Sequence, residues 1–166
     1  MRLIHTVIVP VVALALAACS GGGAKVSREP IRLDLAMVAS AGVNPDDQKR
    51  AAPIVVRVYE LKTDAAFSSA DYFSLQDKDK TVLTDDLVAR DQFQLRPGER
   101  ASIRRMIDPA TTTLGILAAY RDLPNSVWRV AYRLPVAPEA AWYWRTPKLK
   151  LTVYLDANAI RVTESK

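Results

Sequence analysis

The chain has 166 residues, 49% of them hydrophobic, with a formal net charge of +5, which suffices for one domain with a substantial core. The basic residues are few in excess and scattered, whereas a nucleic-acid binder usually concentrates them in a patch. A solvated surface is the favoured interpretation, and the alternative is that they help the protein to lie beside anionic lipid. The single histidine, His5, and the single cysteine, Cys19, both lie in the N-terminal segment, so the rest of the chain excludes imidazole- and thiol-based catalysis, His- or Cys-ligated metals and disulfides.

The first segment has the layout of a bacterial export signal. Arg2 supplies a positive charge, and residues 6–18 form an apolar stretch that ends in small side chains. That stretch is shorter than the roughly 20 apolar residues needed to span a membrane. Leu16–Cys19 (LAAC) resembles a lipobox, at which lipoprotein signal peptidase cuts before a lipid-modified cysteine. We therefore predict a signal peptide over residues 1–18 and lipidation of Cys19.

Lipidation would make the cysteine the mature N-terminus and give it acyl chains of the palmitate type. One chain anchors a protein only marginally, whereas several anchor it durably. Ser20 follows in place of the aspartate that commonly retains lipoproteins in the inner membrane, which favours the periplasmic face of the outer membrane. The alternative is ordinary signal cleavage nearby, which would release a soluble protein with a free thiol.

The segment after the cysteine is polar and contains glycine and serine. Because it also lacks periodicity, we predict that residues 19–29 form a flexible tether. As a coil, about ten residues span roughly 16–19 Å. Residues 30–166 then form one β-sandwich domain, without an internal repeat.

Eight segments of this domain have strand patterns. They are Ile31–Ala39, Pro53–Lys62, Gln92–Leu95, Glu99–Ile107, Leu114–Tyr120, Trp128–Leu134, Lys148–Asp156 and Ala159–Thr163. The nearly all-apolar Leu114–Tyr120 is typical of a central strand. In Pro53–Lys62 the apolar residues change face near Val58, which predicts either a bulge or burial on both faces. The number and spacing of the strands predict a mainly β fold, a two-sheet antiparallel β-sandwich.

One region departs from the strand pattern. Asp64–Asp77 has large apolar residues at near-helical spacing, and Thr84–Ala89 has the character of a further helical turn. We expect one or two short helices inserted between the second and third strands, lying over a sheet or an open end.

The segment Ser40–Ala52 is the best candidate for a binding loop. It joins two strands, is longer than a hairpin turn and carries charges of both signs. Loops on a rigid sandwich often carry binding sites, and mixed charges suit a polar interface. A plain solvated connection is the alternative, and the residues alone do not separate the two.

Other clusters carry weaker signals. Trp142, Tyr143 and Trp144 form a possible second binding surface, although the favoured reading is that the indoles cap the core. The adjacent carboxylates of Asp46-Asp47 and Asp85-Asp86 point apart when extended and lack calcium-loop spacing, so we predict no metal site. The arginines 100, 104 and 105 indicate an exposed edge strand in preference to an anion site.

The order of these features resembles a known family, the TssJ outer-membrane lipoproteins of the bacterial type VI secretion system. The residues that carry the resemblance extend from the lipobox through the Asn-Pro pair after the first strand to the aromatic-basic pair of the sixth. They are Asn44-Pro45, Tyr59, Leu61, Phe67, Asp71, Leu75, Asp86-Leu87, Leu95, Pro97-Gly98, Gly115, Ala118, Tyr120-Arg121-Asp122 and Trp128-Arg129.

The resemblance implies a transthyretin-like sandwich without catalytic residues or cofactors. It also implies a lipid anchor in the outer membrane and a periplasmic partner, the C-terminal region of the inner-membrane protein TssM. In the family, the loop between the first two strands is implicated in that contact. The corresponding residues here are Val43, Asn44, Pro45, Asp46, Asp47, Gln48, Lys49 and Arg50.

Two functions from other classes remain open on the sequence. A carrier of small ligands or lipids would need a sizeable apolar cavity inside the sandwich. A periplasmic hydrolase would need paired carboxyl groups, or a serine and a neutral lysine, converging in one cleft.

Overall fold

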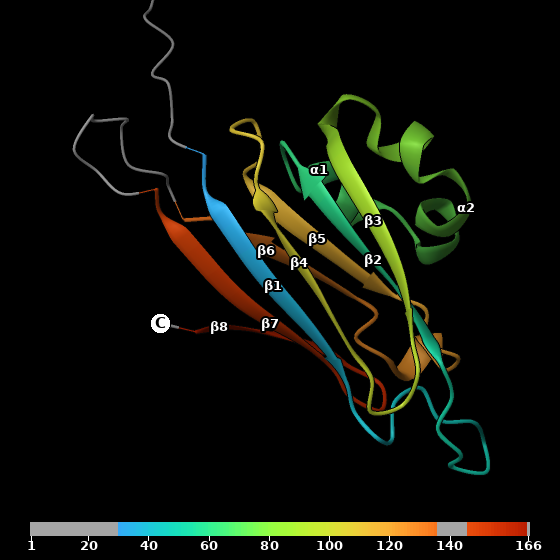
Figure 1. The fold of residues 1–166 in the computed structure, drawn as a ribbon. Coiled ribbons are helices and arrows are strands. Elements are labelled where there is room, and N and C mark those ends of the chain that lie inside the picture. Colours follow the sequence, from blue (N-terminus) through green and yellow to red (C-terminus); the bar gives the residue numbers. More distant parts are fainter. Residues whose placement is uncertain (1–29, 136–145, 166) are drawn as a thin grey trace, which may run out of the picture.

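A computed structural model describes residues 30–135 and 146–165 of the chain. Eight strands form two four-stranded sheets that pack face to face (Figure 1). The strands are β1 (Arg32–Ala39), β2 (Ile54–Leu61), β3 (Leu87–Leu95), β4 (Arg100–Met106), β5 (Thr113–Ala118), β6 (Arg129–Arg133), β7 (Lys148–Leu155) and β8 (Ile160–Ser165). The first sheet has the order β4-β1-β7-β8 and the second β3-β2-β5-β6. The predicted β-sandwich is confirmed.

One strand pair departs from the antiparallel prediction. β1 and β7 run parallel, with Leu33 opposite Leu149 and Leu35 opposite Leu151, whereas the other five pairs among the named strands are antiparallel. Local patterns do not reveal this, because alternation fixes the face of each side chain but not the direction of the neighbouring strand. The first sheet is therefore mixed.

The core between the sheets is formed by alternate residues of β1 and β7 facing those of the second sheet. Leu33, Leu35 and Met37 of β1 are fully buried, as the alternation predicts. Burying a side chain of this size stabilises the fold by about 1.5–3 kcal/mol. The main partners of these residues in the core are Ile54, Val56, Val58, Leu114, Ile116, Leu149, Leu151, Val153 and Leu155.

β2 and β5 lie in the middle of the second sheet and are buried on both faces. Every residue of β5 is buried, which confirms the prediction of a central strand. In β2 the residues from Val58 to Leu61 are all buried, so the change of face reflects burial on both sides. The register shift against β3 falls between Glu60 and Leu61 and not at Val58.

Two helices cover the outer face of the second sheet (Figure 1). They are α1 (Ala65–Ser69) and α2 (Tyr72–Leu83), followed by the 3₁₀ turn η1 (Thr84–Asp86). Their place between the second and third strands confirms the prediction, but α2 extends beyond Asp77, and β3 begins at Leu87, inside the expected helical turn. No helix in the described residues has the length and apolar composition needed to cross a membrane.

A buried carboxylate fixes α2 to the sheet. Asp79, only 5% exposed, accepts hydrogen bonds from Arg90 (2.6 Å) and from the Tyr59 hydroxyl (3.2 Å). Burial alone would raise the pKa of Asp79, but the hydrogen bond and charge of Arg90 outweigh it and hold that pKa below its ordinary value. The carboxylate is therefore ionised and paired at neutral pH. The helix backbone departs from helical geometry at Lys78, immediately before this inward-pointing side chain.

A second buried carboxylate joins the two sheets along their open edge. Arg105 of β4 lies 2.7 Å from both Glu60 of β2 and Asp91 of β3. Glu60 is 2% exposed and also accepts a hydrogen bond from Thr111 (3.2 Å). Removing one partner of such a buried pair would leave an uncompensated charge, which costs more than an exposed pair contributes.

The contact between α1 and the sheet makes a testable prediction at Gly115. A Cβ atom there would lie 3.0 Å from Cζ of Phe67 and 3.1 Å from Cδ1 of Leu61, both buried. We expect Gly115→Ala to lower the free energy of unfolding by about 1–3 kcal/mol through overpacking, as measured by chemical denaturation. Gly42→Ala is the matched control, because a Cβ at Gly42 has no heavy atom within 4 Å. Equal stabilities of the two variants would contradict this packing.

Candidate functional site

The candidate loop lies at one end of the sandwich, between β1 and β2 (Figure 1, lower right). The first described residue, Pro30, lies at the opposite end, just before β1. The eight residues of β1 separate the two ends by roughly 27 Å. An anchor attached before Pro30 and a partner bound at the loop would therefore engage opposite ends of the domain.

The base of the loop is held by Asn44, whose side chain is 4% exposed. Its Nδ2 donates to the carbonyl of Pro53 (2.9 Å), and its Oδ1 accepts from the backbone N–H of Arg121 (2.8 Å). Its own backbone N–H donates to the carbonyl of Ala157 (3.0 Å). These contacts join the loop to segments that follow β5 and β7, one strand from each sheet.

The backbone of Asn44 has φ 50°, in the left-handed region that most side chains avoid. Asparagine tolerates this conformation better than other non-glycine residues, because its short polar side chain finds local hydrogen bonds. The neighbouring Val43 is fully buried and donates its N–H to Ser40. The base of the loop is thus part of the folded domain.

The tip of the loop is a compact turn organised by Asp46. Its Oδ1 accepts from the backbone N–H groups of Gln48 and Arg50, each at 2.9 Å, and its Oδ2 accepts from Nε of Arg50 at 2.7 Å. The backbone hydrogen bond from Arg50, followed by its side-chain bond, holds the pKa of Asp46 below its ordinary value. The carboxylate therefore stays ionised at neutral pH, and the turn is formed before any partner binds.

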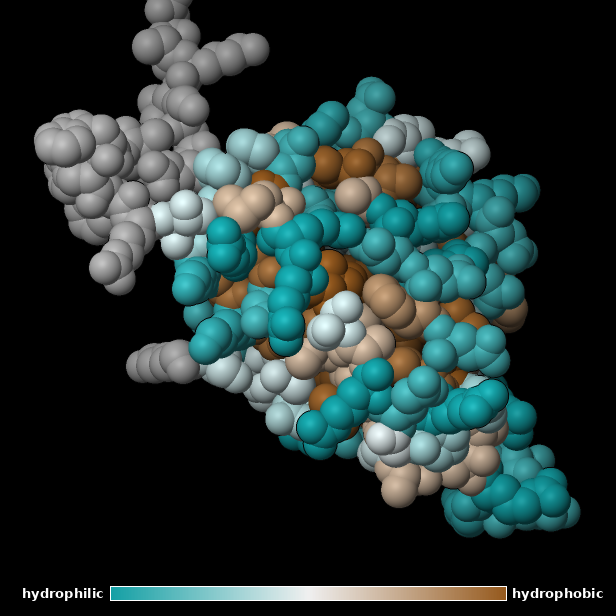
Figure 2. Space-filling view, in the orientation of Figure 1, coloured by the Kyte–Doolittle hydropathy of each residue, from teal (hydrophilic) through white to brown (hydrophobic). Residues whose placement is uncertain are grey.

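The predicted loop residues divide into two groups. Val43 and Asn44 are buried and support the loop instead of forming its surface. Pro45 and Asp46 are half-buried, and the residues that follow, Asp47 to Arg50, are exposed. Figure 2 shows this end of the molecule as strongly hydrophilic.

A small hollow beside the loop contains residues that the sequence analysis did not assign to the site. It encloses about 210 Å³ and is bordered by Asn44, Lys49, Tyr120, Asp122 and Asn158. The Tyr120 hydroxyl is buried and has no hydrogen-bond partner among the described residues. Burial raises the pKa of Tyr120 above its ordinary value, so the hydroxyl keeps its proton and can donate to an incoming acceptor.

One feature of the sequence could have indicated the residues of this hollow. Tyr120-Arg121-Asp122 belongs to the residues that carry the family resemblance, and an antiparallel β5 ends beside the start of β2. The contribution of Asn158 depends on the parallel placement of β7, which no local pattern indicates. Cys19 and the cluster of Trp142, Tyr143 and Trp144 lie outside the described residues.

The buried carboxylates of the described residues are parts of ion pairs. The two buried carboxylates, Glu60 and Asp79, are each paired with arginine. In residues 30–135 and 146–165, no group of three or more His, Cys, Asp or Glu side chains is placed to hold a metal ion. The loop end presents an exposed, polar surface with charges of both signs.

Comparisons with known proteins agree on one family. Residues 31–158 match the family model of the type VI secretion lipoproteins (VasD, EvfM, TssJ). The crystal structure of the lipoprotein TssJ1 from Pseudomonas aeruginosa is 39% identical, with a TM-score of 0.73, over 82% of this chain and 98% of that chain. Serratia marcescens Lip, a membrane-bound component of the type VI secretion system, is 29% identical with a TM-score of 0.71, over 80% of this chain and 96% of that one.

A more distant structure shares the fold, and at its level of identity the comparison shows the fold alone. A chain of a structure described as a type VI membrane complex is 23% identical, with a TM-score of 0.65, over 84% of this chain and 100% of that chain. Among curated proteins, no significant match is found.

The contacts of Asn44 predict how the loop depends on it. Asn44→Ala removes two side-chain hydrogen bonds and retains a Cβ in the left-handed region, so we expect a loss of about 2–4 kcal/mol in unfolding free energy. Asn44→Gly removes the same bonds without the backbone cost and should lose about 1 kcal/mol less. Denaturation measures both variants. Stabilities of both variants equal to the native protein's would show that Asn44 does not hold the loop.

Proposed function

The chain belongs to the type VI secretion lipoprotein family, and on that premise we propose that it is a non-enzymatic adaptor anchored in the outer membrane. It binds the periplasmic C-terminal region of a TssM-like inner-membrane protein and helps to build the type VI secretion membrane complex. The observation that carries this proposal is the arrangement of the domain. A pre-formed charged loop and the attachment point of the tether lie at opposite ends of a rigid sandwich.

The anchor in this proposal is lipidated Cys19, left as the first residue when the signal over residues 1–18 is removed. The acyl chains attach it durably to the inner leaflet of the outer membrane, where the domain faces the periplasm. Residues 20–29 then act as a flexible tether that spans roughly 16–19 Å as a coil. The domain can therefore orient its loop end toward a protein rooted in the opposite membrane.

The partner surface in this proposal is the tip of the loop, Asp46–Arg50, together with the adjacent hollow. The tip is already ordered by its internal hydrogen bonds, so binding does not have to order it, which saves conformational entropy. Its charges of both signs can fix the orientation of the partner and increase the association rate. The buried Tyr120 hydroxyl offers a donor to a partner carbonyl or carboxylate that enters the hollow.

The packing inside the sandwich favours an adaptor function over the alternative of a carrier for small ligands or lipids. Inward-facing side chains of both sheets pack against one another between β1, β7, β2 and β5. The buried carboxylates are neutralised by arginine and do not face each other in a cleft. An adaptor needs a lasting anchor and a stable contact, and neither requires proton transfer.

Binding by the loop is tested by a variant that retains the base. Replacing Asp46–Arg50 with glycine and serine, while Val43 and Asn44 stay, should lower affinity for the purified periplasmic C-terminal region of the TssM-like partner at least about tenfold, as removal of interface anchors does. Calorimetry measures the affinity, and circular dichroism checks the fold.

The matched control is Asp77→Ala with Lys80→Ala, which removes one charge of each sign from the exposed surface of α2. Affinity of the control should equal that of the native protein. Native affinity in the loop variant would show that the contact lies elsewhere.

Anchoring is tested at Cys19. A Cys19→Ser chain exported by a non-lipoprotein signal in place of residues 1–18 should appear in the soluble periplasmic fraction, because it lacks acyl chains. Its affinity for the partner region should be unchanged. Intact-mass spectrometry of the native protein should show acylation at Cys19, and an unacylated N-terminus would contradict the proposed anchor.

A further inference from the structure

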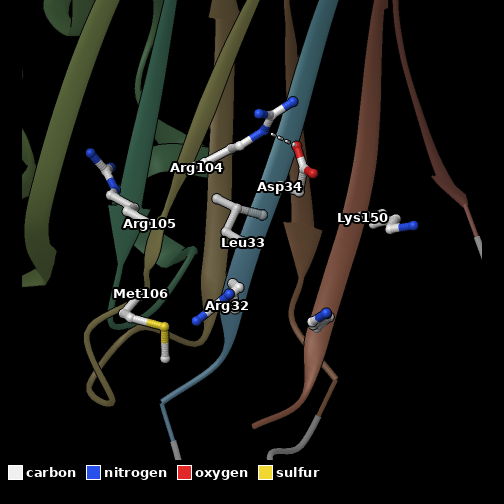
Figure 3. A pocket seen from close by; sticks show the side chains of 8 residues that line it. Arg32, Leu33, Asp34, Arg104, Arg105, Met106 and Lys150 are labelled. Atoms are coloured by element: carbon white, nitrogen blue, oxygen red, sulfur yellow. Dashed lines mark hydrogen bonds and ion pairs between the residues drawn. The ribbon is translucent and has the colours of Figure 1, made fainter.

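A shallow hollow lies on the outer face of the first sheet, on the face away from the core (Figure 3). It encloses about 500 Å³ and crosses the three neighbouring strands β4, β1 and β7. Five basic residues line it, and we name four of them the basic face: Arg32, Arg104, Lys148 and Lys150. All four are exposed. Arg105, their neighbour on β4, points away from this face toward the open edge, where it is paired with Glu60.

The strand register brings like charges together on this face. Arg32 of β1 is directly opposite Lys148 of β7, an arrangement that destabilises a sheet unless something compensates. Asp34 lies between Arg104 and Lys150 in the same register and is the one acidic residue that lines the hollow. Its pair with Arg104 has a distance of 3.3 Å, with side chains 42% and 76% exposed, so water weakens it.

The remaining positive charges have no acidic partner in the part of the chain that the structure describes. No ion pair there involves Arg32, Lys148 or Lys150. Exposed apolar atoms accompany them, since Met106 is 42% exposed at the rim of the hollow and lies opposite Arg32 on β4. Such a face, with several cations, one paired acid and an exposed thioether, is complementary to a partner that has anionic groups at its surface and an apolar layer behind them.

We propose that the basic face docks on the anionic phospholipid headgroups of the membrane in which the protein is anchored. This inference rests on the proposed function in one respect, the attachment through Cys19. The position of the face supports a lipid occupant. Arg32 is two residues from Pro30, where the tether joins the domain, and Lys148 is its immediate neighbour across the ladder.

The tether gives the membrane an advantage over other anionic surfaces. Ten residues behave as a coil of roughly 16–19 Å, so the basic face is held close to the headgroups at high effective concentration. Exposed charges attract an anionic surface over a Debye length of about 8 Å at physiological salt. A tether of this span lets the basic face come that close to the headgroups. Docking would fix the rotation of the domain about its strands, and the loop end would remain free because it lies at the far end of β1.

The test uses residues 20–166, which lack the lipid and the signal. The crystallised TssJ1 chain consists almost entirely of the matching domain, since the match covers 98% of it, and the core here closes within residues 31–160. We expect this protein to sediment with vesicles containing roughly a third phosphatidylglycerol but not with pure phosphatidylcholine. Binding should fall as salt is raised.

Two charge reversals locate the contact. Arg32→Glu with Lys148→Glu should lower the partition coefficient at least about tenfold, because each basic residue near an anionic membrane contributes on the order of 1 kcal/mol. Lys80→Glu with Arg96→Glu gives the same change in net charge on α2 and in the turn before β4 and should retain most of the binding. Circular dichroism confirms that both variants are folded.

Three outcomes would overturn the proposal: equal binding to neutral and anionic vesicles, no binding to either, or equal losses in the two variants. Binding of a poly-glutamate peptide without binding of vesicles would assign the face to an acidic protein segment and would also overturn it. Affinity for the TssM-like partner region is measured in parallel. Native partner affinity in the loop variant would contradict the proposed contact of the loop without affecting the docking face, whereas loss of vesicle binding in the Arg32 and Lys148 variant alone would support the docking face.

Discussion

The side-chain amide of Asn44 is the contact on which the loop end of the domain depends. It joins the chain after β1 to the start of β2, to the segment after β5 and, through its backbone, to the segment after β7. A charged loop without such a base would sample many conformations, and binding would have to order it at an entropic cost. With the base fixed, the internal hydrogen bonds of Asp46 suffice to shape the tip.

Charge is used differently in three parts of the molecule. In the interior, Asp79 and Glu60 are each paired with arginine and fasten a helix to a sheet and one sheet to the other. At the loop tip, the pair of Asp46 and Arg50 is exposed and contributes shape more than stability. On the outer face of the first sheet, Arg32 and Lys148 lie side by side without an acidic partner among the described residues. The last arrangement leaves positive charge available to an anionic surface outside the protein.

The sequence predicted most of the architecture because burial imposes alternation on strands such as β1 and β7. It did not predict the first half of β3, because Leu87 to Asp91 lacks clean alternation on a strand that is half-buried on both sides. The length of α2 was also missed, since its second half is mostly polar and one of its two buried positions there is the paired carboxylate Asp79. The loop was identified by length and charge, but the burial of Val43 and Asn44 and the adjacent Tyr120 required the tertiary structure. The basic face required the parallel register of β1 with β7.

The placement of β1 has a mechanical consequence. Under the proposed function this strand would connect the anchored end to the partner-binding loop, so a pulling force between the two membranes would travel along it. β1 lies between β4 and β7 in the sheet, and its hydrogen bonds to both strands are oriented across the direction of the force. Because the force would act on the two ends of one strand, the backbone of β1, which is already extended, would carry it, and the two ladders would hold the strand in place. The proposed link between the two membranes could therefore hold without depending on the unfolding free energy of the other seven strands.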